Sequence, residues 1–316
     1  PLLPTAAGQA GLELRGDWRD WRPVRLEGRL RLARAAPGGE GHPVPPESRQ
    51  ARLPEGELRF DGRRLATGWQ LQGNARFGDG KGQVAARPTF ELNQTGGQWQ
   101  GSVRELRAQD LLAWVTPWLD EAARRWLVPL DLHGELPEIA FQAGPNLADY
   151  SATVQLRGVA CRPVRGLPGF DNVTGTLEFG SDRGRIELDS RKIRVNTDGL
   201  LRAPITLDTL RGTVNWRRST DGLSLESTGL TLANADLDGR FRGSVTVPDA
   251  GEPSLDIQGQ YRDVRGEQAR RYLPVAVIPA EAVAWLDRAL VGGRVVAGDV
   301  VFRGPPARFP FDGGEG

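Results

Sequence analysis

The stretch that decides the fold is Asp236-Leu237-Asp238-Gly239-Arg240-Phe241-Arg242-Gly243-Ser244-Val245-Thr246-Val247. Its polar residues alternate strictly with residues that are apolar or glycine, six of each. Side chains on a β-strand point to opposite faces in turn, whereas a helix would spread this pattern around its circumference. The stretch therefore predicts a strand with one apolar and one water-facing side, which is typical of an antiparallel sheet covered on one face only.

The same alternation recurs along most of the chain. It is present at 69–77, 154–160, 173–179, 184–188, 193–195, 223–225 and 255–261. At 208–209 the apolar positions change from odd numbers (Ile205, Leu207) to even ones (Leu210, Gly212), which predicts a bulge or a turn. We expect a mainly β fold, with one long, strongly curved and twisted antiparallel sheet that forms an open apolar groove.

Glycine occupies the centre of the apolar face in eight of these strands. Each glycine lies between two apolar residues on alternate positions, and the eight are Gly28, Gly73, Gly101, Gly158, Gly175, Gly212, Gly239 and Gly259. A glycine inside a strand contributes no packing and loses more chain entropy than other residues, so its repetition needs a reason. It predicts a sharply bent sheet in which the glycines from Gly73 to Gly259 leave room along the floor of the groove.

The inward apolar side chains are the candidate lining of this groove. They are Phe60, Trp69, Leu71, Phe77, Trp99, Val103, Leu156, Leu177, Phe179, Leu188, Val214, Trp216, Leu237, Phe241, Ile257 and Tyr261. A large apolar surface left open to water would aggregate unless something apolar occupied it, so such a groove favours acyl chains as ligands. The same pattern also fits plain packing under a helix or against a facing strand.

Two segments interrupt the strands with apolar residues at helical spacing. In the first, 109–127, Pro117 should kink or divide the helix. In the second, 267–291, Pro279 should begin a helix that ends at Gly292 and Gly293. These insertions either cap the apolar face or form a gate or membrane-facing element.

The two insertions also follow similar sequences. Residues 104–108 (Arg-Glu-Leu-Arg-Ala) align with residues 262–266 (Arg-Asp-Val-Arg-Gly) before the helical segments, and 138–141 resembles 299–302 after them. This indicates a long-period repeat, which lets a structure grow in one dimension. We therefore expect residues 1–316 to be a fragment of one elongated β-groove, with a loop at 36–56 and a loose truncated end at 303–316.

Composition excludes several classes of function. The formal net charge is +1, from 41 basic and 40 acidic residues, so no charge field indicates a nucleic acid partner. The single cysteine, Cys161, excludes a disulfide framework or a thiolate metal cluster, and His42 and His133 lie in no catalytic motif. We expect no enzyme activity, no metal and no cofactor.

Targeting signals are absent from the sequence, which begins without methionine and contains no signal peptide or apolar membrane span. The glycine-rich stretch 78–82 carries a lysine but lacks the spacing and the following helix of a phosphate-binding loop, so we interpret it as a hairpin turn. We expect the chain to be part of a longer protein.

Several short stretches occur in an order that is specific when taken together. They are residues 167–177 (LPGFDNVTGTL), 203–207 (APITL), 269–274 (ARRYLP), 284–293 (AWLDRALVGG), 301–304 (VFRG) and 309–311 (FPF). From about Val103 to the C-terminus this series resembles the central region of the YhdP family of AsmA-like envelope proteins. Before Val103 the likeness is limited to the general alternation.

The resemblance implies a long β-groove in the periplasm that carries phospholipid between the inner and outer membranes. The partners would be phospholipid acyl chains, and the inner-membrane anchor and outer-membrane end would belong to missing parts of the parent chain. Two alternatives stand beside this lipid conduit. A non-catalytic envelope scaffold would need a closed β core, and an enzyme acting on lipid or glycan would need a polar cluster that the inward positions lack.

Overall fold

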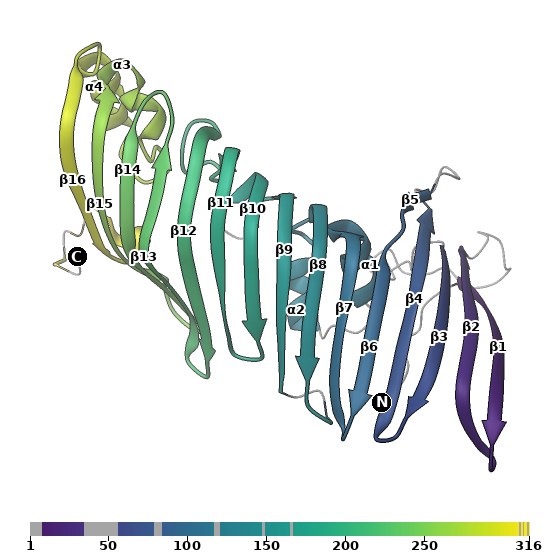
Figure 1. The fold of residues 1–316 in the computed structure, drawn as a ribbon. Coiled ribbons are helices and arrows are strands. Elements are labelled where there is room, and N and C mark those ends of the chain that lie inside the picture. Colours follow the sequence, from purple (N-terminus) through teal and green to yellow (C-terminus); the bar gives the residue numbers. More distant parts are fainter. Residues whose placement is uncertain are drawn as a thin grey trace, which may run out of the picture. The chain divides into compact units, whose positions relative to one another are not determined.

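The computed structural model describes residues 8–34, 56–78, 84–116, 121–146, 149–164, 167–309, 311, 313–314 and 316. Fifteen of its strands follow one another across an open sheet in the order in which they occur in the sequence, and the short β5 pairs with β4 outside this order (Figure 1). All strand pairs with a described register are antiparallel. The predicted mainly β, antiparallel fold is confirmed.

The chain divides into two compact units, Pro1–Val154 and Gln155–Gly316. Unit 1 holds β1 (Gly8–Arg19), β2 (Arg22–Arg34), β3 (Gly56–Leu65), β4 (Gly68–Gly78), β5 (Val84–Ala86), β6 (Thr89–Thr95), β7 (Gln98–Arg107) and β8 (His133–Ala143). Unit 2 holds β10 (Gly169–Gly180), β11 (Arg183–Asn196), β12 (Ile205–Ser219), β13 (Gly222–Ala233), β14 (Asp238–Pro248), β15 (Ser254–Arg265) and β16 (Arg294–Gly304). β9 (Tyr150–Cys161) contains the division.

In each unit the helical segment lies at the end of the strands opposite to three of the hairpin turns. In unit 2, the hairpins β10–β11, β12–β13 and β14–β15 close at one end, which we call the turn end. Because consecutive strands are antiparallel, every second connection returns to the other end, where the segment 266–293 joins β15 to β16. We call this second end the helix end. Unit 1 has the same arrangement, with its helical segment between β7 and β8.

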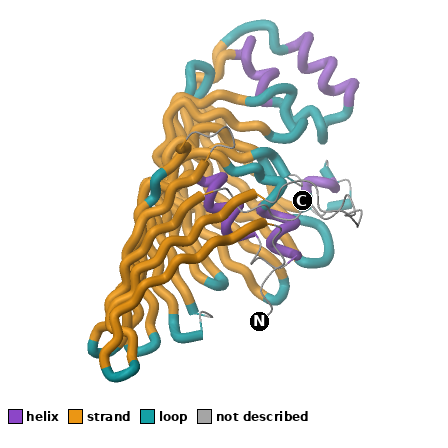
Figure 2. The backbone as a smooth tube through the Cα atoms, turned by 90° about the vertical axis from the view of Figure 1, so that its right-hand side faces the viewer, coloured by secondary structure: helices purple, strands orange, loops and turns teal. Residues whose placement is uncertain are grey.

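The helical segments agree with the interruptions in the strand pattern. α1 (Ala108–Val115) and α2 (Glu121–Leu127) follow β7, and α3 (Gly266–Ala269), the 3₁₀ turn η2 (Arg270–Tyr272) and α4 (Ala280–Ala289) follow β15. Figure 2 shows the helices of each unit set to one side of the strands of that unit. α1 packs against β7 and β8, whereas α4, which Pro279 precedes, has no buried residue. Pro117 lies outside the described residues.

The entries into the two helical segments have the same backbone and burial. Glu105 and Asp263 both adopt positive φ, at 59° and 58°. The apolar residues that follow, Leu106 and Val264, are 7% and 9% exposed. Two residues later, Ala108 begins α1 and Gly266 begins α3. The similarity between these two sequences therefore has a structural counterpart.

The change of phase at 208–209 does not interrupt the strand. β12 is continuous, and its register with β11 is unshifted from Arg191↔Thr209 to Ile193↔Leu207. Both strands change phase together at this point, where Lys192 of β11 has positive φ, at 51°. The prediction of a bulge or turn at 208–209 is wrong, and the irregularity between β12 and β13 lies instead at Thr213–Asn215.

A small core stabilises unit 2 at this phase change. Ile193 is fully buried and packs with Leu207 and Leu210. The buried Ser190 hydroxyl donates to the Thr174 carbonyl oxygen at 3.0 Å and accepts from the Thr174 N–H at 2.9 Å. This pair of hydrogen bonds satisfies backbone groups where the β10–β11 register shifts between Asp171 and Gly175.

The remaining expectations concern connections and ends. Most of the predicted loop 36–56 lies outside the described residues, and Gly56 begins β3. Within 303–316, expected to be loose, the rings of Phe309 and Phe311 lie 6.2 and 5.4 Å from that of Phe302. The Arg308 Nε donates to Glu252 at 2.7 Å, so the described part of this end makes specific contacts.

An apolar sheet face as the candidate site

The predicted lining residues lie on the apolar face of the sheet, within their own units. Register pairs such as Ile186↔Val214, Trp216↔Leu225 and Leu230↔Phe241 bring apolar side chains opposite one another in unit 2. All sixteen lie on strands except Leu237, which is in the turn between β13 and β14. Phe77 is buried at 5% exposure, and the other fifteen are half-buried. This face is therefore neither a closed core nor an ordinary wet surface.

Unit 2 contains a small cavity on this face, with a volume of about 230 Å³. Its apolar lining comes from four adjacent strands and consists of Val214, Leu225, Leu230, Phe241, Val245 and Ile257. Val214, Phe241 and Ile257 were among the lining residues predicted from the sequence, whereas the other three were not. Leu225 and Val245 continue the alternation, whereas Leu230 is out of phase with Leu225 because the β13–β14 register shifts between Ser227 and Leu230.

Several groove glycines lie beneath aromatic rings of neighbouring strands. A Cβ atom at Gly73 would lie 2.6 Å from the ring of Phe90, and one at Gly101 would lie 2.7 Å from that of Phe141. At Gly259, the ring of Phe241 would lie 2.5 Å away. The expectation that these glycines leave room along the floor is wrong, because aromatic side chains already fill the space above them.

Other glycines allow close approach of the backbone. A Cβ at Gly175 would collide with the Glu187 carbonyl oxygen, and one at Gly212 with that of Gly229. Gly158 has φ of 60°, a left-handed conformation that glycine adopts without strain. Gly239 faces the Phe241 ring on its own strand, 2.7 Å from its Cβ position. The glycines that lie between apolar residues therefore meet different local needs: space for a ring, close backbone approach or a left-handed conformation.

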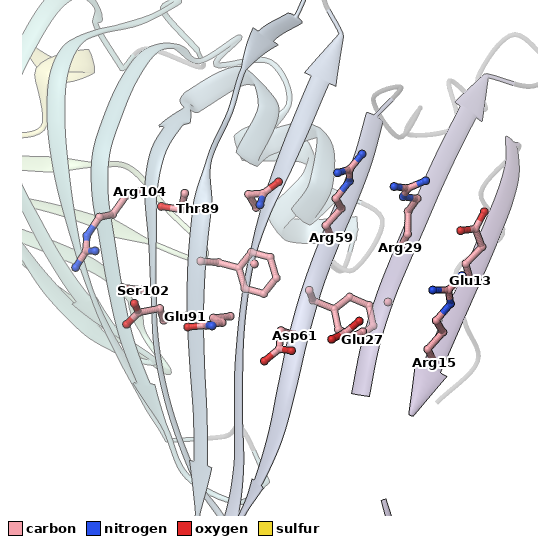
Figure 3. A pocket seen from close by; sticks show the side chains of 16 residues that line it. Glu13, Arg15, Glu27, Arg29, Arg59, Asp61, Thr89, Glu91, Ser102 and Arg104 are labelled. Atoms are coloured by element: carbon pink, nitrogen blue, oxygen red, sulfur yellow. The ribbon is translucent and has the colours of Figure 1, made fainter. Parts of the chain in front are cut away.

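The opposite, polar face of unit 1 has a wider hollow of about 690 Å³ (Figure 3). Charged side chains line it in rows, and one of them, Asp61, pairs with Arg25 of the neighbouring strand at 2.8 Å. The hydrogen bond from Arg59 is the main cause that lowers the pKa of Glu57. Cross-strand ion pairs of this kind stabilise a water-facing sheet surface, so we assign no ligand to this hollow.

The described residues offer little for catalysis. Among them, no group of three or more His, Cys, Asp or Glu side chains could hold a metal ion. Burial raises the pKa of the Cys161 thiol, which disfavours the reactive thiolate. His133 is exposed, its Nδ1 lying 2.6 Å from the Asp131 carbonyl oxygen, and His42 lies outside the described residues.

No helix in the parts of the chain that the structure describes is both long and apolar enough to cross a membrane. The model of the YhdP protein family matches residues 4–316. The chain belongs to the YhdP family. This YhdP-family chain is also similar to the intermembrane phospholipid transporter YhdP of Escherichia coli (strain K12), with 25% identity over 150 residues.

The match to the E. coli protein covers 48% of this chain and 12% of the relative. The chain therefore matches only about an eighth of the length of that YhdP protein. No solved structure matches the chain.

Proposed function

We propose that this chain is a central segment of a periplasmic conduit that carries phospholipid between the inner and outer membranes. The observation that carries the proposal is the open sheet face in unit 2, where half-buried apolar side chains surround a cavity of about 230 Å³. Membership of the YhdP family supports lipid transport, as does a relative named as an intermembrane phospholipid transporter.

Acyl chains suit this face energetically. Each methylene group moved from water to an apolar surface contributes about 0.8 kcal/mol, so a long acyl chain is held firmly overall. Successive strands offer similar apolar side chains, for example Leu188, Val214 and Leu225. Sliding from one strand to the next exchanges nearly equal contacts, which keeps the barrier to movement low.

The phospholipid headgroups would stay near water at the rim of the face while the acyl chains lie on it. An inner-membrane anchor and an outer-membrane end would come from parts of the parent protein outside this chain. The role is non-catalytic: lipid moves and no bond changes, so no cofactor is needed and no nucleic acid takes part.

The alternative, a structural or assembly scaffold of the cell envelope, would have a closed β core. In the part of the chain that the structure describes, the sheet runs from β1 to β16 without closing. The half-buried state of fifteen of the sixteen predicted lining residues also favours a face that takes up a ligand.

Lipid carried by the purified chain tests the proposal directly. The chain would be isolated without detergent, extracted with organic solvent and analysed by mass spectrometry for phospholipid. Leu225→Arg places a charge on the cavity wall, whereas Ser224→Arg places the same charge on the opposite face of the same strand. We expect phospholipid with the wild type and the Ser224 variant, and a severalfold loss with Leu225→Arg.

A crosslinking experiment covers the case in which Leu225→Arg fails to fold. The photoreactive residue p-benzoylphenylalanine would replace Leu225 or, as the control, Ser224. Crosslinks to phospholipid from position 225 but not from position 224 are expected. A folded wild type without bound lipid, together with equal labelling at both positions, would overturn the conduit.

A further inference from the structure

A cluster of polar side chains lies at the helix end of unit 2, beside the apolar face. Its centre is Asp236, in the turn between β13 and β14, which is only 4% exposed. The Asp236 carboxylate accepts from Arg265 Nη2 at 2.5 Å and from Arg271 Nη1 at 2.9 Å. The Tyr272 hydroxyl lies 3.3 Å from the same carboxylate and also contacts Asn234. The turn between β13 and β14 therefore meets the segment 265–272, about 30 residues further along the chain.

The charges in this cluster do not cancel. Two guanidinium groups share one carboxylate, and no other described carboxylate lies within ion-pair distance of either arginine. The side chains of Arg265 and Arg271 are 50% and 49% exposed. A guanidinium has five N–H donors, so each retains donors that face solvent after its bond to Asp236. The ion-paired groups of the cluster therefore carry one more positive than negative charge, and Glu267, which is not ion-paired with Arg265, acts on this arginine electrostatically.

The entry to the helical segment of unit 1 carries a different ion pair. Arg107, which aligns with Arg265, donates to both carboxylate oxygens of Asp110 at 2.6 and 2.8 Å. Its side chain is 28% exposed, and Ala113 occupies the position that aligns with Arg271. This pair joins the end of β7 to the first turn of α1. Arg271 of unit 2 therefore has no arginine counterpart at the aligned position of unit 1.

The cluster is close enough to the cavity to act with it. On β13 and β14 the cavity pair Leu230↔Phe241 is followed by Leu232↔Gly239 and then by the turn that contains Asp236. Four residues of strand, from Leu230 to Asn234, span about 13 Å at 3.3 Å each. An acyl chain reaches through half of the ~30 Å hydrocarbon core of a bilayer, about 15 Å. A lipid whose headgroup lies at the cluster would place its acyl chains in the cavity.

We propose that Arg265 and Arg271 form a rim site for the phosphate of a phospholipid headgroup whose acyl chains lie on the apolar face. This site rests on the proposed function and adds to it the part of the lipid that is recognised. Guanidinium groups bind phosphate through charge-assisted hydrogen bonds. Asp236 orients both groups and halves their charge, which keeps the binding weak enough for a passing lipid to leave.

Retention of two lipids that share their acyl chains and differ in the phosphate-containing headgroup tests the site. The full chain would be loaded from uncharged detergent micelles with acyl-labelled phosphatidylglycerol or with diacylglycerol of the same acyl chains. Arg271→Gln removes the excess charge but leaves Asp236 paired with Arg265, whereas Arg271→Lys keeps the charge. Arg218→Gln is the matched control, because Arg218 pairs with Asp249 at the turn end.

The wild type should retain phosphatidylglycerol roughly threefold to tenfold better than diacylglycerol, as one charge-assisted contact would give. Arg271→Gln should bring the ratio of retained phosphatidylglycerol to retained diacylglycerol close to one. Arg271→Lys and Arg218→Gln should preserve this ratio. The ratio should fall as salt is raised, because solvent-exposed charges are screened.

Each other outcome has a defined meaning. Equal retention of both lipids by the wild type, or an unchanged ratio in Arg271→Gln, overturns the rim site and leaves the conduit standing. Retention of neither lipid overturns the proposed function. Loss of the ratio when inorganic phosphate is added would assign the arginines to free phosphate instead of a headgroup.

Discussion

At the scale of single residues, glycine and aromatic residues act as pairs across strands. Phe241 lies over Gly259, and Tyr261 lies over Gly298 of the next strand. A ring that lies flat on a sheet needs a neighbour without a Cβ, and it covers backbone that glycine leaves exposed. The alternating glycines of the sequence therefore mark where large rings lie down on the apolar face, and these rings make part of its floor.

This pairing predicts a large cost for a methyl group at Gly259. In Gly259→Ala the new Cβ would lie 2.5 Å from the Phe241 ring and 2.9 Å from Val300, so the ring must move. Overpacking of this kind typically costs about 1–3 kcal/mol of unfolding free energy. The matched control is Gly229→Ala, whose Cβ would meet nothing within 4 Å. Urea unfolding should show a clear loss for the first variant and little change for the second, and equal midpoints would contradict the pairing.

Tyr272 carries a second residue-scale prediction. Burial is the main cause that raises the pKa of its hydroxyl, which is about 10 in an unfolded chain. Because the folded pKa is raised, the stabilising effect of the neutral hydroxyl is present below about pH 10 and is lost as the pH rises through the folded value.

Tyrosinate absorbance would measure this pKa, since the chain has three tyrosines and Tyr272→Phe identifies the contribution of one. We expect that contribution to titrate above the value in the unfolded chain. Above about pH 10 the wild type should lose more stability than Tyr272→Phe, which has no group to ionise. Titration of Tyr272 at the unfolded value would show that the hydroxyl is not desolvated in the cluster.

At the scale of elements, the two helical insertions are attached to the sheet in different ways. α1 starts at the buried Ala108 and packs on β7 and β8. α4 has no buried residue, and Arg202 Nη2 reaches it from the β11–β12 connection, donating to both oxygens of Asp287 at 2.7 and 2.8 Å. A helix held in this way opens more easily than one held by buried surface. This contrast bears on whether the insertions cap or gate the face.

Removing the arginine should therefore loosen α4 alone. A partly exposed ion pair contributes about 0.2–1 kcal/mol, so Arg202→Ala should speed amide hydrogen exchange in residues 280–289 up to about fivefold. The global unfolding midpoint should change little. Arg218→Ala removes a comparable ion pair at the turn end and should leave exchange in α4 unaltered. Faster exchange throughout unit 2 in Arg202→Ala would mean that the pair supports the sheet as a whole.

Elements were predictable where their signal is local, and less so where it depends on neighbouring strands. The alternation of 236–247 indicates β14, and Pro279 with Gly292 and Gly293 brackets α4. The phase change at 208–209 is visible in the sequence of β12, but the positive φ that accompanies it belongs to Lys192 on β11. A bulge is a property of a strand pair, so one strand alone does not locate it.

At the scale of the whole molecule, the candidate site combines predictable and unpredictable parts. The apolar face follows from period-two alternation, so three of the six apolar residues around the cavity could be named in advance. The rim cluster could not, because Asp236 lies 29 and 35 residues from Arg265 and Arg271, and the β14–β15 pairing and the path of the chain after β15 bring them together. The net charge of the cluster could not be predicted either, because it depends on which carboxylates lie within ion-pair distance of the two arginines.

An uncovered apolar face also governs how the whole chain behaves without lipid. In the described residues, Ile193 is the only large apolar side chain below 2% exposure, and Leu12, Leu14 and Trp18 of β1 are exposed. Contiguous apolar patches larger than a few hundred Å² drive association in water unless they are covered. We expect the delipidated chain to form oligomers that grow with concentration and to bind an apolar dye, as sedimentation velocity and fluorescence would show.

Lipid should reverse this association by covering the same surface. Reloading with phospholipid should shift the chain toward monomer and reduce dye binding in proportion to the lipid retained. Leu225→Arg should weaken both association and lipid retention because its charge lies on the apolar face, whereas Ser224→Arg should change neither. If the delipidated wild type is monomeric at every concentration and binds no dye, the apolar face must be covered by the chain itself, and its half-buried side chains would then belong to a core.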